Sequence, residues 1–143
     1  MKSIQDIMTR NVSSCSPDDT LYDAAVKMKD LDVGVIPVTD NQNHLMGLVT
    51  DRDLVLRGYA AKKSESTKIQ DVISDDLYSV SPATDVQEAS QLMAEKQVRR
   101  LPVVDNGELV GIVSLGDLSL EKKSDHAAGV ALNEISEKRD ELH

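Results

Sequence analysis

Two stretches of this sequence are copies of one pattern. Residues Ile4–Ile7 have the sequence IQDI, and IQDV follows at Ile69–Val72, 65 positions later. The same spacing separates four further pairs: Pro17 and Pro82, Ala24 and Ala89, Met28 and Met93, and Pro37 and Pro102. A repeat of this length decides which segments fold as equivalent units, so it constrains the fold before any other feature. We therefore predict a duplicated α/β (α+β) protein.

The spacing shortens to 64 positions late in each copy, where Leu45 pairs with Leu109 and Asp53 with Asp117. The first copy thus carries one extra residue between Asn41 and His44, in a turn that can accept it. Each copy is of a size at which an isolated core is marginal, so we expect the copies to share a core by pseudo-twofold packing of their sheets. The predicted layout is a first repeat at residues 1–61, a linker at 62–68, a second repeat at 69–120 and a C-terminal helical tail at 121–143.

Each copy is predicted to follow the order β-α-β-β-α. The first strands are expected at Val12–Cys15 and Leu77–Val80, each followed by Ser-Pro. Capping-box spacing then predicts a helix start in each copy, from Thr20 with Asp23 and from Asp85 with Glu88. Met28 and Met93 lie at core spacing on these helices, which favours core packing over a cofactor role.

The remainder of each copy is predicted to be a hairpin and a helix. β-branched runs cover Val33–Thr39, Leu45–Thr50, Val98–Val104 and Leu109–Ser114. Asn106-Gly107 favours a tight hairpin turn in the second copy. The last helices are expected to begin at Asp51 and Leu115, with a further helix after Ser119.

Composition disfavours several classes of partner. The net charge of −9 disfavours nucleic acid, and three tyrosines without Trp or Phe provide no stacking platform for single strands. No apolar run approaches the ~18 residues of a membrane-spanning helix. The N-terminus, MKSIQDIMTR, lacks the apolar stretch of a signal peptide. We therefore expect no nucleic-acid or membrane partner and a cytoplasmic location.

Neither a metal centre nor a catalytic group is indicated. The single Cys15 has no second cysteine with which to form a disulfide or a zinc-ligand pair. We expect a buried thiol, with an intermolecular disulfide as the alternative. His44, His126 and His143 lack metal spacing or an obvious carboxylate orienter and are expected to be solvated. There is no P-loop, dinucleotide fingerprint or nucleophile–base pair, so no enzyme, metal or cofactor is expected.

Both copies place a hydroxyl at the end of the last strand and an Asp three residues later. These residues are Thr50 with Asp53, in TDRD, and Ser114 with Asp117, in SLGD. The spacing is typical of helix capping, and an acid in the first turn also suits the helix dipole. A hydroxyl and amides at a helix start can equally bind an anion, while the carboxylate accepts ribose hydroxyls. On pattern alone, both interpretations stay open.

The repeated motifs resemble a tandem pair of cystathionine-β-synthase (CBS) domains, the Bateman module. The resemblance spans roughly residues 3–120. It rests on DVGVIPVTD and GLVTDRDLV in the first copy and on VRRLPVVDNGELVGIVSLGDL in the second. The chain is similar to small bacterial stand-alone CBS pairs. The resemblance implies a non-catalytic sensor of AMP, ADP, ATP or S-adenosylmethionine, with two clefts between the repeats.

The resemblance also implies roles for individual residues. Asp53 and Asp117 would accept ribose hydroxyls, and Thr50 and Ser114 would contact ribose or phosphate. The backbone near Ser13 and Ser14, and near Tyr78 and Ser79, would contact the adenine edge. The walls around the base would be formed by Val35, Ile36, Pro37, Arg100, Leu101 and Pro102.

The copies differ where phosphate contacts are expected. Arg99 and Arg100 precede the proline in the second copy, whereas Gly34 and Val35 precede it in the first. Guanidinium groups suit phosphate, so unequal sites are expected. Arg52 is expected on a solvated face or in a dimer contact, with a ligand-phosphate contact as the alternative. We also expect a homodimer and an unknown protein effector. The alternative is a structural or interaction module with vestigial clefts.

Overall fold

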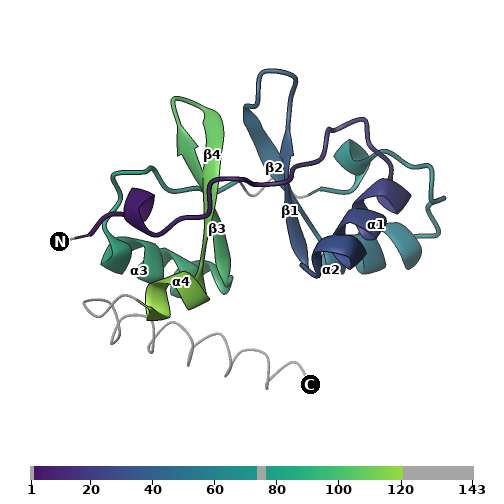
Figure 1. Ribbon diagram of the computed structural model, residues 1–143. Coiled ribbons are helices and arrows are strands. Elements are labelled where there is room, and N and C mark those ends of the chain that lie inside the picture. Colours follow the sequence, from purple (N-terminus) through teal and green to yellow (C-terminus); the bar gives the residue numbers. More distant parts are fainter. Residues whose placement is uncertain (1, 74–76, 121–143) are drawn as a thin grey trace. The chain divides into compact units, whose positions relative to one another are not determined.

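The computed structural model describes residues 2–73 and 77–120. Figure 1 shows the helices and strands and their order along the chain. In that order they are η1 (Ile4–Asp6), α1 (Leu21–Leu31), β1 (Val35–Thr39), β2 (Leu45–Thr50), α2 (Asp51–Asp53), η2 (Leu54–Tyr59), η3 (Ile69–Asp71), α3 (Val86–Lys96), β3 (Arg100–Asp105), β4 (Glu108–Ser114) and α4 (Leu115–Ser119). The predicted duplication and mixed α/β class are confirmed. The helix expected after Ser119 lies almost wholly outside the described residues.

The chain forms two compact units that do not coincide with the two sequence repeats. Unit 1 contains Met1–Val12, Ser79–Asn106 and Val110–His143, and unit 2 contains Ser13–Tyr78 and Gly107–Leu109. The segment that opens each repeat therefore belongs to the unit built on the other repeat. The predicted sharing of a core through the sheets stays a prediction.

Unit 2 is built from α1 and the β1–β2 hairpin. Thr20 and Asp23 form the predicted capping box, and Asp32 ends the helix in the left-handed region at φ 55°. The core packs Ala24 and Met28 of α1 against hairpin residues, and it includes Cys15, Ile36, Val38, Val49 and Ile69. Burial of the Cys15 thiol and of Met28 confirms both predictions. Ile69 supplies a core side chain to this unit from the segment that opens the second repeat.

The β1–β2 hairpin is antiparallel, and Val35 lies opposite Thr50. The register shifts between Val38 and Thr39. The following turn takes up the extra residue with Asn43 in the left-handed region at φ 64°. Asp40 N–H donates to the His44 carbonyl oxygen at 3.0 Å and closes the turn.

Unit 1 is built from α3 and the β3–β4 sheet, with residues 2–12 packed alongside (Figure 1). Ile4 is fully buried. Thr9 pairs with Ile112 of β4 through two backbone hydrogen bonds, of 2.8 and 2.9 Å. Gly111 permits this approach, because an added Cβ there would lie 2.8 Å from the Thr9 carbonyl oxygen. The N-terminal segment is therefore part of the packing of unit 1.

Two local predictions need correction. Asp85 caps α3 by accepting from the Gln87 N–H, and no reciprocal box with Glu88 forms. The strands expected before the first helices are reduced to single parallel bridges, Cys15 to Val38 and Val80 to Val103. The helix that begins at Asp51 changes to π-helical hydrogen bonding over Leu54–Tyr59. No helix in the described ranges is long and apolar enough to cross a membrane.

Candidate functional site

The Thr/Ser-x-x-Asp junction forms a complete capping box in both units. In unit 2, Thr50 N–H donates to Asp53 Oδ2 at 3.0 Å, and Asp53 N–H donates to Thr50 Oγ1 at 3.0 Å. The corresponding distances for Ser114 and Asp117 in unit 1 are 2.9 and 3.1 Å. The capping interpretation is therefore confirmed. Each box uses only Oδ2, and both carboxylates are partly exposed, so Oδ1 can still accept a ligand hydroxyl.

The same backbone hydrogen bond ties each junction to the first residues of its own hairpin. Asp51 N–H donates to the Gly34 carbonyl oxygen at 2.9 Å, and Leu115 N–H donates to the Arg99 carbonyl oxygen at 2.8 Å. The strand entry and the helix start are therefore held together in the same way in both units. Downstream of these anchors, Ile36, Pro37, Leu101 and Pro102 are buried, whereas Val35 and Arg100 are partly exposed.

The segment predicted to contact the base lies beside the same hairpin in unit 2. Cys15 N–H donates to the Pro37 carbonyl oxygen at 2.9 Å, which places Ser14 next to β1. Lys27 Nζ donates to the Ser14 carbonyl oxygen at 2.7 Å, and Thr39 Oγ1 donates to Ser14 Oγ at 3.0 Å. Around this hairpin, unit 2 gathers the predicted residues Ser13, Ser14, Val35, Ile36, Pro37, Thr50, Arg52 and Asp53.

Unit 1 gathers the equivalent set around β3 and β4. Val80 N–H donates to the Pro102 carbonyl oxygen at 3.0 Å, so Ser79 occupies the place that Ser14 has in unit 2. Its predicted residues are Ser79, Arg99, Arg100, Leu101, Pro102, Ser114 and Asp117. The boundary between the units falls after Tyr78, which belongs to unit 2.

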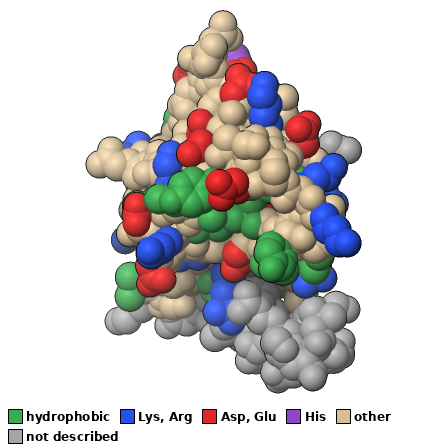
Figure 2. Space-filling view, turned by 90° about the vertical axis from the view of Figure 1, so that its right-hand side faces the viewer, with side chains coloured by type: hydrophobic (Ala, Val, Ile, Leu, Met, Phe, Trp, Pro, Cys, Tyr) green, Lys and Arg blue, Asp and Glu red, His purple; other side chains and the backbone are tan. Residues whose placement is uncertain are grey.

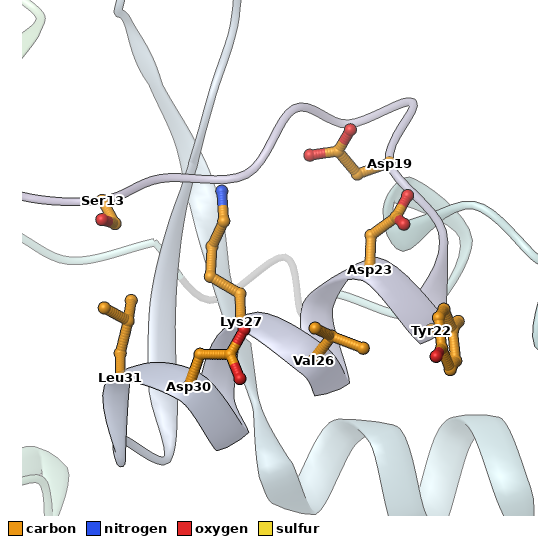
Figure 3. Close-up of a pocket in the computed structure, with 8 residues that line it drawn as sticks. All are labelled: Ser13, Asp19, Tyr22, Asp23, Val26, Lys27, Asp30 and Leu31. Atoms are coloured by element: carbon orange, nitrogen blue, oxygen red, sulfur yellow. The ribbon is translucent and has the colours of Figure 1, made fainter.

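The structure adds a hollow in each unit that sequence analysis missed. In unit 2 it has a volume of 610 Å³ and lies between the segment at Ser13–Asp19 and the outer face of α1. Figure 3 shows Lys27 rising from α1 beside this segment, with Asp23 and Asp30 on the same helix. The hollow of unit 1, of 360 Å³, lies at the equivalent place on α3 and includes Glu88 and Glu95. The signal for these hollows in the sequence was the pair of acidic positions repeated at a spacing of 65, Asp23 with Glu88 and Asp30 with Glu95.

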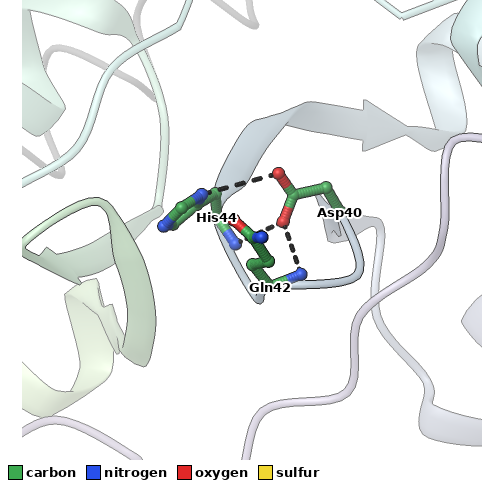
Figure 4. A network of polar contacts seen from close by, with 3 residues as sticks. All are labelled: Asp40, Gln42 and His44. Carbon is green, nitrogen blue, oxygen red and sulfur yellow. Dashed lines mark hydrogen bonds and ion pairs between the residues drawn. The ribbon is translucent and has the colours of Figure 1, made fainter.

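His44 is not simply solvated. Its Nδ1 lies 3.6 Å from Asp40 Oδ2, as Figure 4 shows, so the expectation that it lacks a carboxylate neighbour was wrong. The His44 backbone N–H donates to Asp40, and this hydrogen bond lowers the pKa of the Asp40 carboxyl. Among the described residues, no group of three or more His, Cys, Asp or Glu side chains is arranged to hold a metal ion.

Comparison with known proteins identifies the family. The model of the CBS domain matches twice, at residues 4–58 and 69–122, and the chain belongs to this family. It is 51% identical over 138 residues to protein YlbB of Bacillus subtilis, covering 96% of this chain and 93% of YlbB.

Solved structures agree with this assignment. The crystal structure of Hypoxic Response Protein I with two coordinated zinc ions is 35% identical with a TM-score of 0.78, covering 84% of this chain and 98% of that one. The crystal structure of CBSX2 in complex with AMP is 29% identical with a TM-score of 0.72, covering 82% and 93%. The tandem CBS fold predicted from the repeats is confirmed.

Proposed function

We propose that this protein is a non-catalytic, cytoplasmic sensor that binds adenosine-containing ligands at the Thr50–Asp53 and Ser114–Asp117 junctions. The observation that carries the proposal is that each capping box uses Oδ2 of its aspartate, so that, among the described residues, Oδ1 is left for a ligand. A carboxylate fixed in this way can accept ribose hydroxyls without giving up its structural bond. The AMP complex of CBSX2 supports a ligand of the class AMP, ADP, ATP or S-adenosylmethionine.

The mechanism proposed for signalling is a population shift. A ligand can move a conformational equilibrium only by the difference between its affinities for the two states. Binding at the junctions would favour one arrangement of the chain, and a protein effector would respond to that arrangement. No chemical step is required of any residue.

Thermal unfolding with and without AMP, ADP, ATP and S-adenosylmethionine tests the proposal. A ligand at 100 times its dissociation constant stabilises by about 2.7 kcal/mol. For a chain of this size, that raises the midpoint by roughly 5–11 °C. Absence of a shift with every one of these compounds would refute the sensor proposal.

Variants separate capping from binding. Asp53→Ala and Asp117→Ala are expected to weaken ligand binding and to cost ~0.5–1.5 kcal/mol of stability, because each removes the hydrogen bond from the N-cap N–H to the aspartate. Asp23→Ala is the matched control, because the Thr20–Asp23 box has the same bonds at 3.0 and 3.1 Å and no proposed ligand role. If all three variants reduce the ligand-induced shift equally, the carboxylates act as caps only.

A homodimer is proposed from the exposed apolar side chains of unit 2. Tyr22, Val55, Leu56 and Tyr59 are between 48% and 85% exposed. Figure 2 shows a face on which hydrophobic side chains gather among acidic and basic ones. Such surfaces mark interaction sites. Light scattering should give twice the mass of 15.6 kDa, and Val55→Asp with Leu56→Asp should return the monomer.

The same surface favours the second candidate, a structural or protein-interaction module with vestigial clefts. That function predicts a dimer without any adenosyl-dependent stabilisation. The ligand melts and the light scattering together therefore distinguish the two candidates.

A further inference from the structure

The two junctions share their backbone but carry opposite charge. Five positions correspond between them: Gly34, Val35, Asp51, Arg52 and Asp53 in unit 2 match Arg99, Arg100, Leu115, Gly116 and Asp117 in unit 1. Their side-chain charges sum to −1 in unit 2 and to +1 in unit 1. The same backbone bond anchors both sets, and the difference in charge comes from the side chains.

In unit 2 the Asp51 carboxylate lies beside the position that corresponds to Arg99 of unit 1. Asp51 Oδ2 would lie 3.1 Å from a Cβ added at Gly34, the position that corresponds to Arg99. At the matching place in unit 1, Leu115 is only 6% exposed and carries no charge. Arg99 and Arg100 form no ion pair with any described residue. A phosphate near this position would therefore meet a carboxylate in unit 2 and guanidinium groups in unit 1.

The segments predicted to contact the base differ in the side-chain hydrogen bonds that hold them, and here unit 2 has the additional groups. In unit 2, Ser14 is held by Lys27 Nζ through its carbonyl oxygen and by Thr39 Oγ1 through its hydroxyl. The residues that match Lys27 and Thr39 in unit 1 are Leu92 and Val104, whose side chains cannot form hydrogen bonds. Ser79 consequently lacks both side-chain anchors that fix Ser14, although the backbone bridge to the hairpin is present in both units.

A fixed segment discriminates between bases better than a loose one. Adenine presents a donor at its 6-position, whereas hypoxanthine presents an acceptor there. A pinned backbone cannot turn to accommodate the reversed polarity, and it also loses less conformational freedom on binding. Lys27 and Thr39 are therefore positioning residues that act through Ser14.

We propose that the two units recognise different parts of an adenosyl ligand: unit 2 selects the base and disfavours phosphate, whereas unit 1 selects the phosphate. The inference rests on the proposed function. It assigns a neutral or cationic adenosyl compound to unit 2 and a nucleotide to unit 1. Asp51 and Arg99 determine the charge of the ligand, and Lys27 with Thr39 determine the identity of the base.

Isothermal titration calorimetry on single-site proteins tests this division. Asp117→Ala leaves the site of unit 2, and Asp53→Ala leaves that of unit 1. The probes are adenosine, inosine and AMP. The Asp117→Ala protein should bind adenosine more tightly than AMP, and the Asp53→Ala protein should show the reverse order.

Second substitutions test the named residues. In the Asp117→Ala background, Asp51→Asn should raise AMP affinity about fivefold and leave adenosine affinity unchanged, because a nearby unit charge removed in a water-like dielectric has about that effect. In the Asp53→Ala background, Arg99→Gln should lower AMP affinity by a similar factor. Lys27→Met combined with Thr39→Val should reduce the adenosine-to-inosine preference of unit 2 roughly two- to tenfold.

Glu65→Gln is the control for charge, because it removes one carboxylate from the exposed linker of the same unit. Equal AMP-to-adenosine ratios in the two single-site proteins would overturn the proposal. An equal effect of Asp51→Asn and Glu65→Gln would overturn the role of Asp51, and an unchanged base preference would overturn that of Lys27. If ADP, ATP or S-adenosylmethionine binds the unmodified protein but neither adenosine nor AMP does, this inference alone is overturned. If none of these compounds binds, the proposed function itself fails and this inference falls with it.

Discussion

Replacement of Ile4 by Ala should destabilise the second repeat, although Ile4 lies in the segment that opens the first. Ile4 is 0% exposed and belongs to unit 1. Its N–H donates to the Thr84 carbonyl oxygen at 2.9 Å, and Gln5 N–H donates to that of Pro82 at 3.0 Å. The backbone at this buried side chain is therefore bonded to the second repeat.

The size of the effect follows from complete burial. Removing three carbons from a buried aliphatic side chain costs about 2–5 kcal/mol, including the cavity that remains. At roughly 2–4 °C per kcal/mol for a chain of this size, the midpoint of thermal unfolding should fall by about 4–20 °C. Ile69→Ala is the matched control, because Ile69 is also 0% exposed and its N–H donates to the Asp19 carbonyl oxygen at 2.8 Å in unit 2.

Hydrogen exchange followed by mass spectrometry locates the damage. In Ile4→Ala, peptides within residues 86–118 should lose protection, while peptides within 21–54 keep it. Ile69→Ala should give the opposite pattern, because loss of local packing lowers the free energy of opening in its own unit. The packing of each repeat's first segment in the unit of the other repeat would be refuted if Ile4→Ala exposed residues 21–54 and left 86–118 protected.

Three further predictions concern single sites. Gly111→Ala should cost about 1–3 kcal/mol in chemical denaturation, because the added Cβ would lie 2.8 Å from the Thr9 carbonyl oxygen and must push the N-terminal segment away; an unchanged midpoint would contradict that contact. The lowered pKa of Asp40 means that its ionised form stabilises the fold above its unfolded pKa and that this contribution is lost as the pH falls through the folded pKa. Asp40→Asn should therefore reduce the loss of unfolding free energy below about pH 4. The same pH dependence in the variant and the unmodified protein would count against the turn hydrogen bonds. Burial raises the pKa of the Cys15 thiol, so a thiol reagent at neutral pH should label the folded protein slowly and the unfolded protein rapidly. Immediate labelling of the folded protein would show that Cys15 is accessible.

Much of the local structure was predictable because its determinants are local. Capping residues fix where α1 and α2 begin, and Asn106-Gly107 fixes the β3–β4 turn, with φ of 54° and 85°. The Thr50–Asp53 and Ser114–Asp117 pairs were located by their spacing alone. Their capping role became certain only from the hydrogen bonds.

The placement of each repeat's first segment in the unit of the other repeat could not be predicted in the same way. Ile4 and Ile69 stand in the same motif, so the pattern is satisfied whichever hairpin each segment packs against. The π-helical bonds of Leu54–Tyr59 likewise have no signal in residue type. The side-chain hydrogen bonds to Ser14 come from Lys27 and Thr39, which are 13 and 25 positions away, and only the fold brings these residues together.

The exchanged segments also set an order of assembly during synthesis. Residues 13–73 contain nearly all of the packing of unit 2, including Ile69, so that unit can form as soon as this stretch has left the ribosome. Residues 4–9 have their partners at Pro82, Thr84 and Ile112, which emerge much later. Residues 4–9 are therefore translated well before their partners, and the Ile4 side chain stays in contact with solvent until the segment that reaches Ile112 has been made.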